Sequence, residues 1–124
     1  MYALKYHPSL TPQTWKRFNP GQQILMIANE LKRLIKGIDS SNQLEQQACK
    51  DRVLELTDLT KSSSTGSLQK ELGRWREMFS SQYFTQESTS LLQALGRSLL
   101  QLQSSTFPLI HDFDPTPNAH STTD

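Results

Sequence analysis

The chain has 124 residues, which suits one domain with a single core. Its formal net charge of +1 provides no whole-molecule attraction to nucleic acids or anionic membranes. One cysteine excludes an intramolecular disulfide, and the sequence shows no signal peptide and no apolar run of membrane-spanning length. We therefore expect a cytoplasmic protein without membrane contact.

Residues 1–10 alternate apolar and polar side chains, which predicts an extended arm packed on helices. Thr11 followed by Pro12 resembles a helix cap with proline at the first helical position, so we expect a short helix from Pro12 to Phe18. We interpret Trp15 as a lid on the core rather than as a ligand-stacking residue.

The clearest amphipathic helix spans residues 22–38. Its apolar side chains recur every three or four residues and share one face: Ile24, Ile27, Ala28, Leu31, Leu34, Ile35 and Ile38. Asn19, Pro20 and Gln22 predict its start, with a capping box between the first and the last of them. Because such a face must be covered, other helices are expected to pack on it.

The outer face of this helix is the first candidate binding surface. Leu25 and Met26 lie off the apolar arc, and Asn29, Lys32, Arg33 and Lys36 point outward. We expect this surface to bind a protein partner. The alternative is that its basic residues contact nucleic acid, although the near-zero net charge argues against a dense phosphate footprint.

A second long helix is predicted from about Asn42 to Thr60, capped by Ser40 with Gln43. Its expected apolar face consists of Leu44, Ala48, Cys49, Val53, Leu56 and Leu59. Arg52 projects near the middle of that face, where a charge needs a partner. We predict a buried ion pair of Arg52 with Glu45, with Glu30, Glu71 or Glu77 as alternatives. A ligand-anion site at Arg52 is the functional interpretation.

Two further helices are predicted after a polar loop over residues 61–67. The helix from Ser67 to Ser81 is expected to bury Leu68, Leu72, Trp75, Met78 and Phe79. The helix from Gln86 to Gln103 is expected to bury Leu91, Leu92, Leu95, Leu99 and Leu102, with Leu100 outside this stripe. Gly96 weakens that helix unless it permits a close backbone approach.

The last residues, 106–124, contain three prolines and three aspartates, which predicts a flexible acidic tail. Phe107, Leu109, Ile110 and Phe113 form an apolar cluster within it. Two interpretations remain open. The cluster is a short docking segment for a partner, or it folds back and covers the end of the bundle.

No motif indicates catalysis, a cofactor or a metal ion. The three histidines, His7, His111 and His120, lie outside the predicted helices, so a bundle-core metal site is not expected. Cys49 is predicted to be a buried, inert thiol.

The sequence thus predicts an all-α protein: an antiparallel four-helix bundle over residues 1–105, with an N-terminal arm and a disordered tail over residues 106–124. The predicted function is a non-catalytic interaction module that binds another protein or forms a homodimer. Nucleic-acid binding through residues 29–36 is the alternative, and a small-molecule pocket near Arg52 and Trp75 is a more distant one.

Overall fold

The computed structural model describes residues 11–81 and 88–113, which form helices and turns without a β-strand. In these ranges the α-helices are α1 (Pro12–Trp15), α2 (Pro20–Asp39), α3 (Gln43–Ser62), α4 (Gly66–Ser80) and α5 (Ser88–Leu100), and a 3-10 helix, η1 (Phe107–Phe113), follows them. The predicted all-α class is confirmed. The predicted arm over residues 1–10 and the tail beyond residue 113 lie outside the described residues.

Helix α2 starts as the sequence predicts. The backbone N–H of Gln22 donates to Oδ1 of Asn19 over 2.8 Å, and the backbone N–H of Asn19 donates to Oε1 of Gln22 over 2.9 Å. Pro20 occupies the first helical position. This capping box satisfies two backbone donors that the helix itself leaves without partners.

The predicted cap of α3 is wrong by two residues. Asn42, rather than Ser40, caps the helix, because its Oδ1 accepts the backbone N–H of Glu45 over 3.0 Å. Ser40 already terminates α2, donating its backbone N–H to the carbonyl oxygen of Lys36. Ser41 then reverses the chain with a φ of 59°. Ser40 therefore caps the C-terminus of α2, and the N-terminus of α3 is capped two residues later by Asn42.

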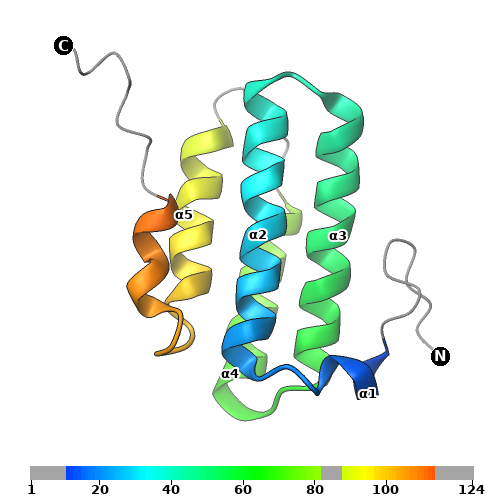
Figure 1. The fold of residues 1–124 in the computed structure, drawn as a ribbon, viewed down its shortest axis with the longest axis vertical. Coiled ribbons are helices and arrows are strands. Elements are labelled where there is room, and N and C mark those ends of the chain that lie inside the picture. Colours follow the sequence, from blue (N-terminus) through cyan, green and yellow to red (C-terminus); the bar gives the residue numbers. More distant parts are fainter. Residues whose placement is uncertain (1–10, 82–87, 114–124) are drawn as a thin grey trace.

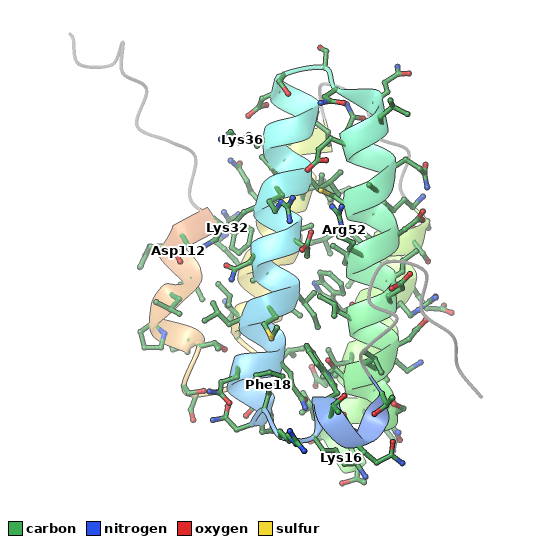
Figure 2. All side chains as sticks on the ribbon, turned by 45° about the vertical axis from the view of Figure 1, so that its right-hand side comes forward. Lys16, Phe18, Lys32, Lys36, Arg52 and Asp112 are labelled. Carbon is green, nitrogen blue, oxygen red and sulfur yellow. The ribbon has the colours of Figure 1, made fainter. Side chains whose placement is uncertain are left out.

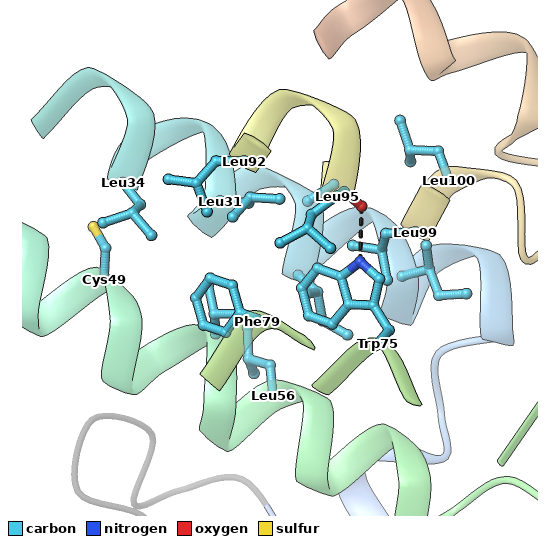
Figure 3. Close-up of a cluster of buried hydrophobic side chains, with 14 of the residues drawn as sticks. Leu31, Leu34, Cys49, Leu56, Trp75, Phe79, Leu92, Leu95, Leu99 and Leu100 are labelled. Carbon is cyan, nitrogen blue, oxygen red and sulfur yellow. Dashed lines mark hydrogen bonds between the residues drawn. The ribbon is translucent and has the colours of Figure 1, made fainter. Parts of the chain in front are cut away.

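The helices surround one continuous core (Figures 1 and 3). Helix α2 contacts α3 and α5, and α4 contacts the same two helices. The buried apolar residues are Trp15, Ile24, Ile27, Ala28, Leu31, Leu34, Ile38, Cys49, Val53, Leu56, Leu59, Leu72, Trp75, Phe79, Leu92, Leu95, Leu99, Leu100 and Phe113. The indole N–H of Trp75 donates to the carbonyl oxygen of Leu95 over 2.7 Å, which ties α4 to α5 (Figure 3).

Helix α1 is a single turn that closes one end of the core. Trp15 is fully buried, and its indole N–H donates to Oγ1 of Thr60 over 2.9 Å. The side-chain amide of Gln23 donates to the carbonyl oxygen of Trp15 over 2.9 Å. The interpretation of Trp15 as a lid on the core is confirmed. The helix ends at Trp15, short of the predicted Phe18.

Four leucine and methionine positions differ from their predicted faces. Leu44 is 87% exposed, Met78 50% and Leu91 41%, although all three were expected on apolar faces. Leu44 and Leu91 lie in the first turns of their helices, beyond the packed middle of the core. Leu100, expected outside the leucine stripe, is fully buried. It lies on the side of α5 toward the C-terminal segment (Figure 3), which provides a second cover for this helix.

Residues 106–113 differ most from the sequence prediction. They were expected to begin a flexible tail, but η1 packs along α5 (Figure 1), and Thr106 and Phe113 are buried. The hydroxyl of Thr106 donates to the carbonyl oxygen of Leu100 over 2.7 Å, which fixes the turn between α5 and η1. The packed helical unit therefore continues past the predicted boundary at residue 105.

Candidate interaction surface

The basic side chains on the outer face of α2 are partly engaged within the molecule. Asn29, Arg33 and Lys36 are exposed. Arg33 lies 3.3 Å from Oε2 of Glu30 and 3.5 Å from Oε2 of Glu45. Two of its guanidinium nitrogens thus face carboxylates, which reduces the free positive charge that this face offers.

Lys32 connects this face to the C-terminal segment. Its ammonium nitrogen lies 3.0 Å from Oδ2 of Asp112 and 5.6 Å from the ring centroid of Phe113. The first contact is an ion pair between half-exposed groups, and the second is a cation–π contact. Figure 2 shows Lys36 and Lys32 one above the other on the side of α2 toward η1, with Asp112 of η1 next to Lys32.

Phe113 is the anchor of η1. It is 2% exposed, and its ring lies directly over Gly96 of α5. The guanidinium of Arg97 donates to the carbonyl oxygen of Phe113 over 3.0 Å. The helix-interior glycine, whose cost the sequence left unexplained, is therefore required by this ring. Of the two interpretations of the apolar cluster, the structure has the folded-back one.

The two residue groups that the sequence singled out separately form one surface. A groove of about 200 Å³ lies between α2, α5 and η1, lined by Lys32, Ile35, Lys36, Asp39, Gln93, Asp112 and Phe113. Along η1, Leu109 and Ile110 are half-buried, while Phe107 is 51% exposed. We call residues 29–36 together with residues 107–113 the α2–η1 surface.

Leu25 and Met26 contribute less to this surface than expected. Both are half-buried, and Met26 packs against the core. They were predicted to lie off the apolar arc of α2 and to belong to the binding surface. In the structure they are side chains at the edge of the core, and the large exposed apolar residue of the α2–η1 surface is Phe107.

Arg52 lies in a network of alternating charges between α2 and α3. Arg52 pairs with Glu30, with 3.8 Å between Nη1 and Oε1, while Glu45, the predicted partner, pairs with Arg33. Figure 2 shows Arg52 between α2 and α3. The side chains of Arg52 and Glu30 are 22% and 15% exposed. Oε1 of Glu30 is buried without a hydrogen bond, so Arg52 supplies its electrostatic compensation.

Cys49 adjoins this network. It is fully buried, and its thiol donates to Oε2 of Glu45 over 3.5 Å. Burial, followed by this hydrogen bond and the nearby negative charge, raises the pKa of Cys49 from 9.0 to about 11. The thiol is therefore protonated at neutral pH, which makes it a poor nucleophile.

Metal-binding clusters and membrane-spanning helices are both absent from the described ranges. No group of three or more His, Cys, Asp or Glu side chains there is arranged to hold a metal ion. No helix in the same ranges is long and apolar enough to cross a membrane.

Sequence reasoning missed a second charged region, between α3 and α4. Lys61, Lys70, Arg74 and Arg76 line a groove there together with Asp58, Glu77 and Gly73. The missed signal is the helical spacing of Lys70, Gly73, Arg74 and Glu77, which puts these four residues on one face of α4.

Comparison of the chain with protein families, curated proteins and solved structures gives no match. Function therefore has to be inferred from the surfaces themselves.

Proposed function

We propose that this protein is a non-catalytic helical interaction module that binds a protein partner, or a second copy of itself, through the α2–η1 surface. The observations that support it most are the exposed Phe107 at the start of η1 and, at the end of η1, a groove lined by charged residues of both signs together with Ile35 and Phe113. Interfaces are enriched in aromatic anchors surrounded by polar residues. The exposed side chains of Asn29 and Lys36 would form part of that polar rim.

The architecture proposed for this module is an antiparallel four-helix bundle formed by α2, α3, α4 and α5. It is supported by the contacts of each of these helices with two of the others. The three-residue connections 40–42 and 63–65 also favour it, because short loops join antiparallel neighbours. Rigid helices of this kind hold a binding surface in a fixed geometry.

The absence of catalysis is part of the proposal. Its support is chemical: the buried Cys49 has a pKa raised to about 11, and its thiol contacts Glu45 and Arg52 rather than an imidazole base. Nucleic-acid binding by residues 29–36, the alternative from the sequence, has weak support, because Lys32 and Arg33 both pair with carboxylates.

Site-specific photocrosslinking tests this proposal. A photoreactive amino acid is placed at Phe107 or Lys36 on the α2–η1 surface, and at Gln47, which is exposed on α3, as the control. We expect a single defined adduct from the first two positions and none from Gln47. Its mass distinguishes a homodimer from a complex with another protein.

The proposed surface is then tested by affinity. Phe107→Ser should weaken binding of the purified partner, or dimerisation in sedimentation experiments, without lowering the melting temperature, because half of this ring is already exposed. A monomer at all concentrations that gives no adduct from either position would refute the proposal. Binding of generic DNA or RNA at low salt, lost in Lys36→Gln, would favour the nucleic-acid alternative instead.

A further inference from the structure

The groove between α3 and α4 has the features of an anion site. Its volume is about 500 Å³, within the range of small-molecule pockets. Lys61 reaches it from the last turn of α3, and Lys70 and Arg74 reach it from α4. Of the charged side chains that line it, four are cationic and two are anionic, which leaves two net positive charges.

The ion pairs of the groove are unevenly distributed. Arg76 is held by Asp58, with 2.5 Å from Nε to Oδ1 and 3.1 Å from Nη2 to Oδ2. This bidentate pair connects α3 to α4 and fixes the groove wall. In contrast, Lys61, Lys70 and Arg74 form no ion pair with any residue in 11–81 or 88–113.

Gly73 is the second observation that points to a ligand. Glycine in a helix interior is less stable than alanine. At Gly96 the buried ring of Phe113 requires it. A Cβ at Gly73 would meet only the Nζ and Cε atoms of Lys61, at 3.8 and 3.9 Å, which is ordinary contact. The packing of the protein therefore does not require glycine here, and the missing side chain leaves the α4 backbone open to a ligand in the groove.

We propose that this groove binds a small soluble ligand through a phosphate monoester group, held by Lys61, Lys70 and Arg74 over Gly73. A phosphate monoester carries about 1.5 to 2 negative charges at neutral pH, which matches the net charge of the lining. The guanidinium of Arg74 can bind two phosphate oxygens at once, and the two ammonium groups supply further donors.

The lining favours a small ligand over a nucleic acid or a membrane. It includes no aromatic side chain on which a base could stack. Glu77 lies seven residues after Lys70, about 10 Å along the helix, and would repel the next phosphate of a continuous backbone. The lining residues are charged apart from Gly73, so the groove offers no apolar side chain for insertion into lipid.

Titration of the full chain tests this site. The probes are inorganic phosphate and a nucleoside monophosphate, followed in amide proton–nitrogen correlation spectra. We expect saturable shifts centred on Lys61, Lys70, Gly73 and Arg74. Lys70→Gln and Arg74→Gln should each weaken binding by about tenfold, whereas Lys50→Gln should leave it unchanged. Lys50 is the matched charge control, about 16 Å before Lys61 along α3.

Gly73→Leu separates a binding role from a structural one. It should raise the melting temperature, because leucine is the better helix former, and it should abolish binding by filling the groove. Non-saturable shifts, equal weakening by Lys50→Gln, or unchanged binding by Gly73→Leu would each refute the proposal. Tighter binding to anionic phospholipid vesicles or to duplex DNA, lost in Arg74→Gln, would also overturn it. None of these variants alters the α2–η1 surface, so the two proposals fail separately.

Discussion

Gly96→Ala should destabilise this protein, although alanine is the better helix former. The new Cβ would lie 2.4 Å from Cδ1 of Phe113 and 2.5 Å from Cε1 and Cγ. Nonbonded carbon atoms prefer separations of about 3.5 to 4.0 Å, so the ring would have to move by roughly 1 Å or leave its site. Gly96→Ala therefore has two opposite effects: a higher helix propensity stabilises α5, whereas the clash with Phe113 destabilises the packing of η1 on α5.

The magnitude follows from these two opposing effects. Alanine gains about 1 kcal/mol over glycine in a helix interior. Overpacking costs about 1 to 3 kcal/mol, and expelling the ring forfeits about 1.5 to 3 kcal/mol of apolar burial. Loss of the hydrogen bond from Arg97 to the carbonyl oxygen of Phe113 adds about 1 kcal/mol. Overpacking and expulsion are alternatives, and less the gain of alanine they cost about 0 to 2 and about 1.5 to 3 kcal/mol. We therefore expect Gly96→Ala to lower the free energy of unfolding by up to about 2 kcal/mol, the limit for the less costly alternative.

A double-mutant cycle in urea measures this coupling. In a Phe113→Ala background the ring is absent, so Gly96→Ala should stabilise the protein by up to about 1 kcal/mol. The opposite signs in the two backgrounds are the specific result expected. Gly73→Ala is the matched control and should stabilise the wild-type protein, because a Cβ there meets no close atoms. Equal stabilisation by Gly96→Ala in both backgrounds would refute the packing of Phe113 on Gly96.

Three further predictions concern α2 and α3. Arg52→Met should lower the free energy of unfolding by about 1 to 3 kcal/mol, because it leaves the buried Oε1 of Glu30 without a nearby positive charge. The double variant with Glu30→Leu should regain most of this free energy, as urea denaturation can measure. Asn19→Ala should lower the free energy of unfolding by about 1 kcal/mol by removing the capping box, and an unchanged urea midpoint would contradict this. The fold raises the pKa of Cys49 from 9.0 to about 11, so the unfolded state releases the thiol proton at a lower pH than the folded state does. The free energy of unfolding should therefore fall between pH 9 and pH 11, and it should fall less in Cys49→Ala. Urea titrations at several pH values measure this difference.

Local signals in the sequence predicted local structure well. The Asn19 capping box, the apolar face of α2 and the burial of Trp15 and Trp75 all follow from spacing and residue chemistry within a few turns. The candidate residues Lys32 and Phe113 were also identified, but as members of two separate groups. Their contact joins residues about 80 positions apart, and neither spacing nor composition encodes such a pairing.

The errors have a common physical origin. Helical periodicity reports one apolar face per helix, so it placed Leu100 outside the core, whereas α5 is covered on two sides. The proline-containing, polar composition of residues 106–113 predicts a tail, because the one buried ring there, Phe113, gives no periodic signal. Gly96 was the available clue, since an unfavourable glycine inside a helix indicates a close approach from elsewhere in the chain.

The ion pair of Lys32 with Asp112 also has a consequence for synthesis of the protein. The two residues are separated by 80 positions, so α2 leaves the ribosome long before its partner does. Domains complete their packing only when the contacting segments are available. Until residue 113 has emerged, the face of α5 at Gly96 stays uncovered, and the nascent chain exposes an apolar surface that the finished protein does not.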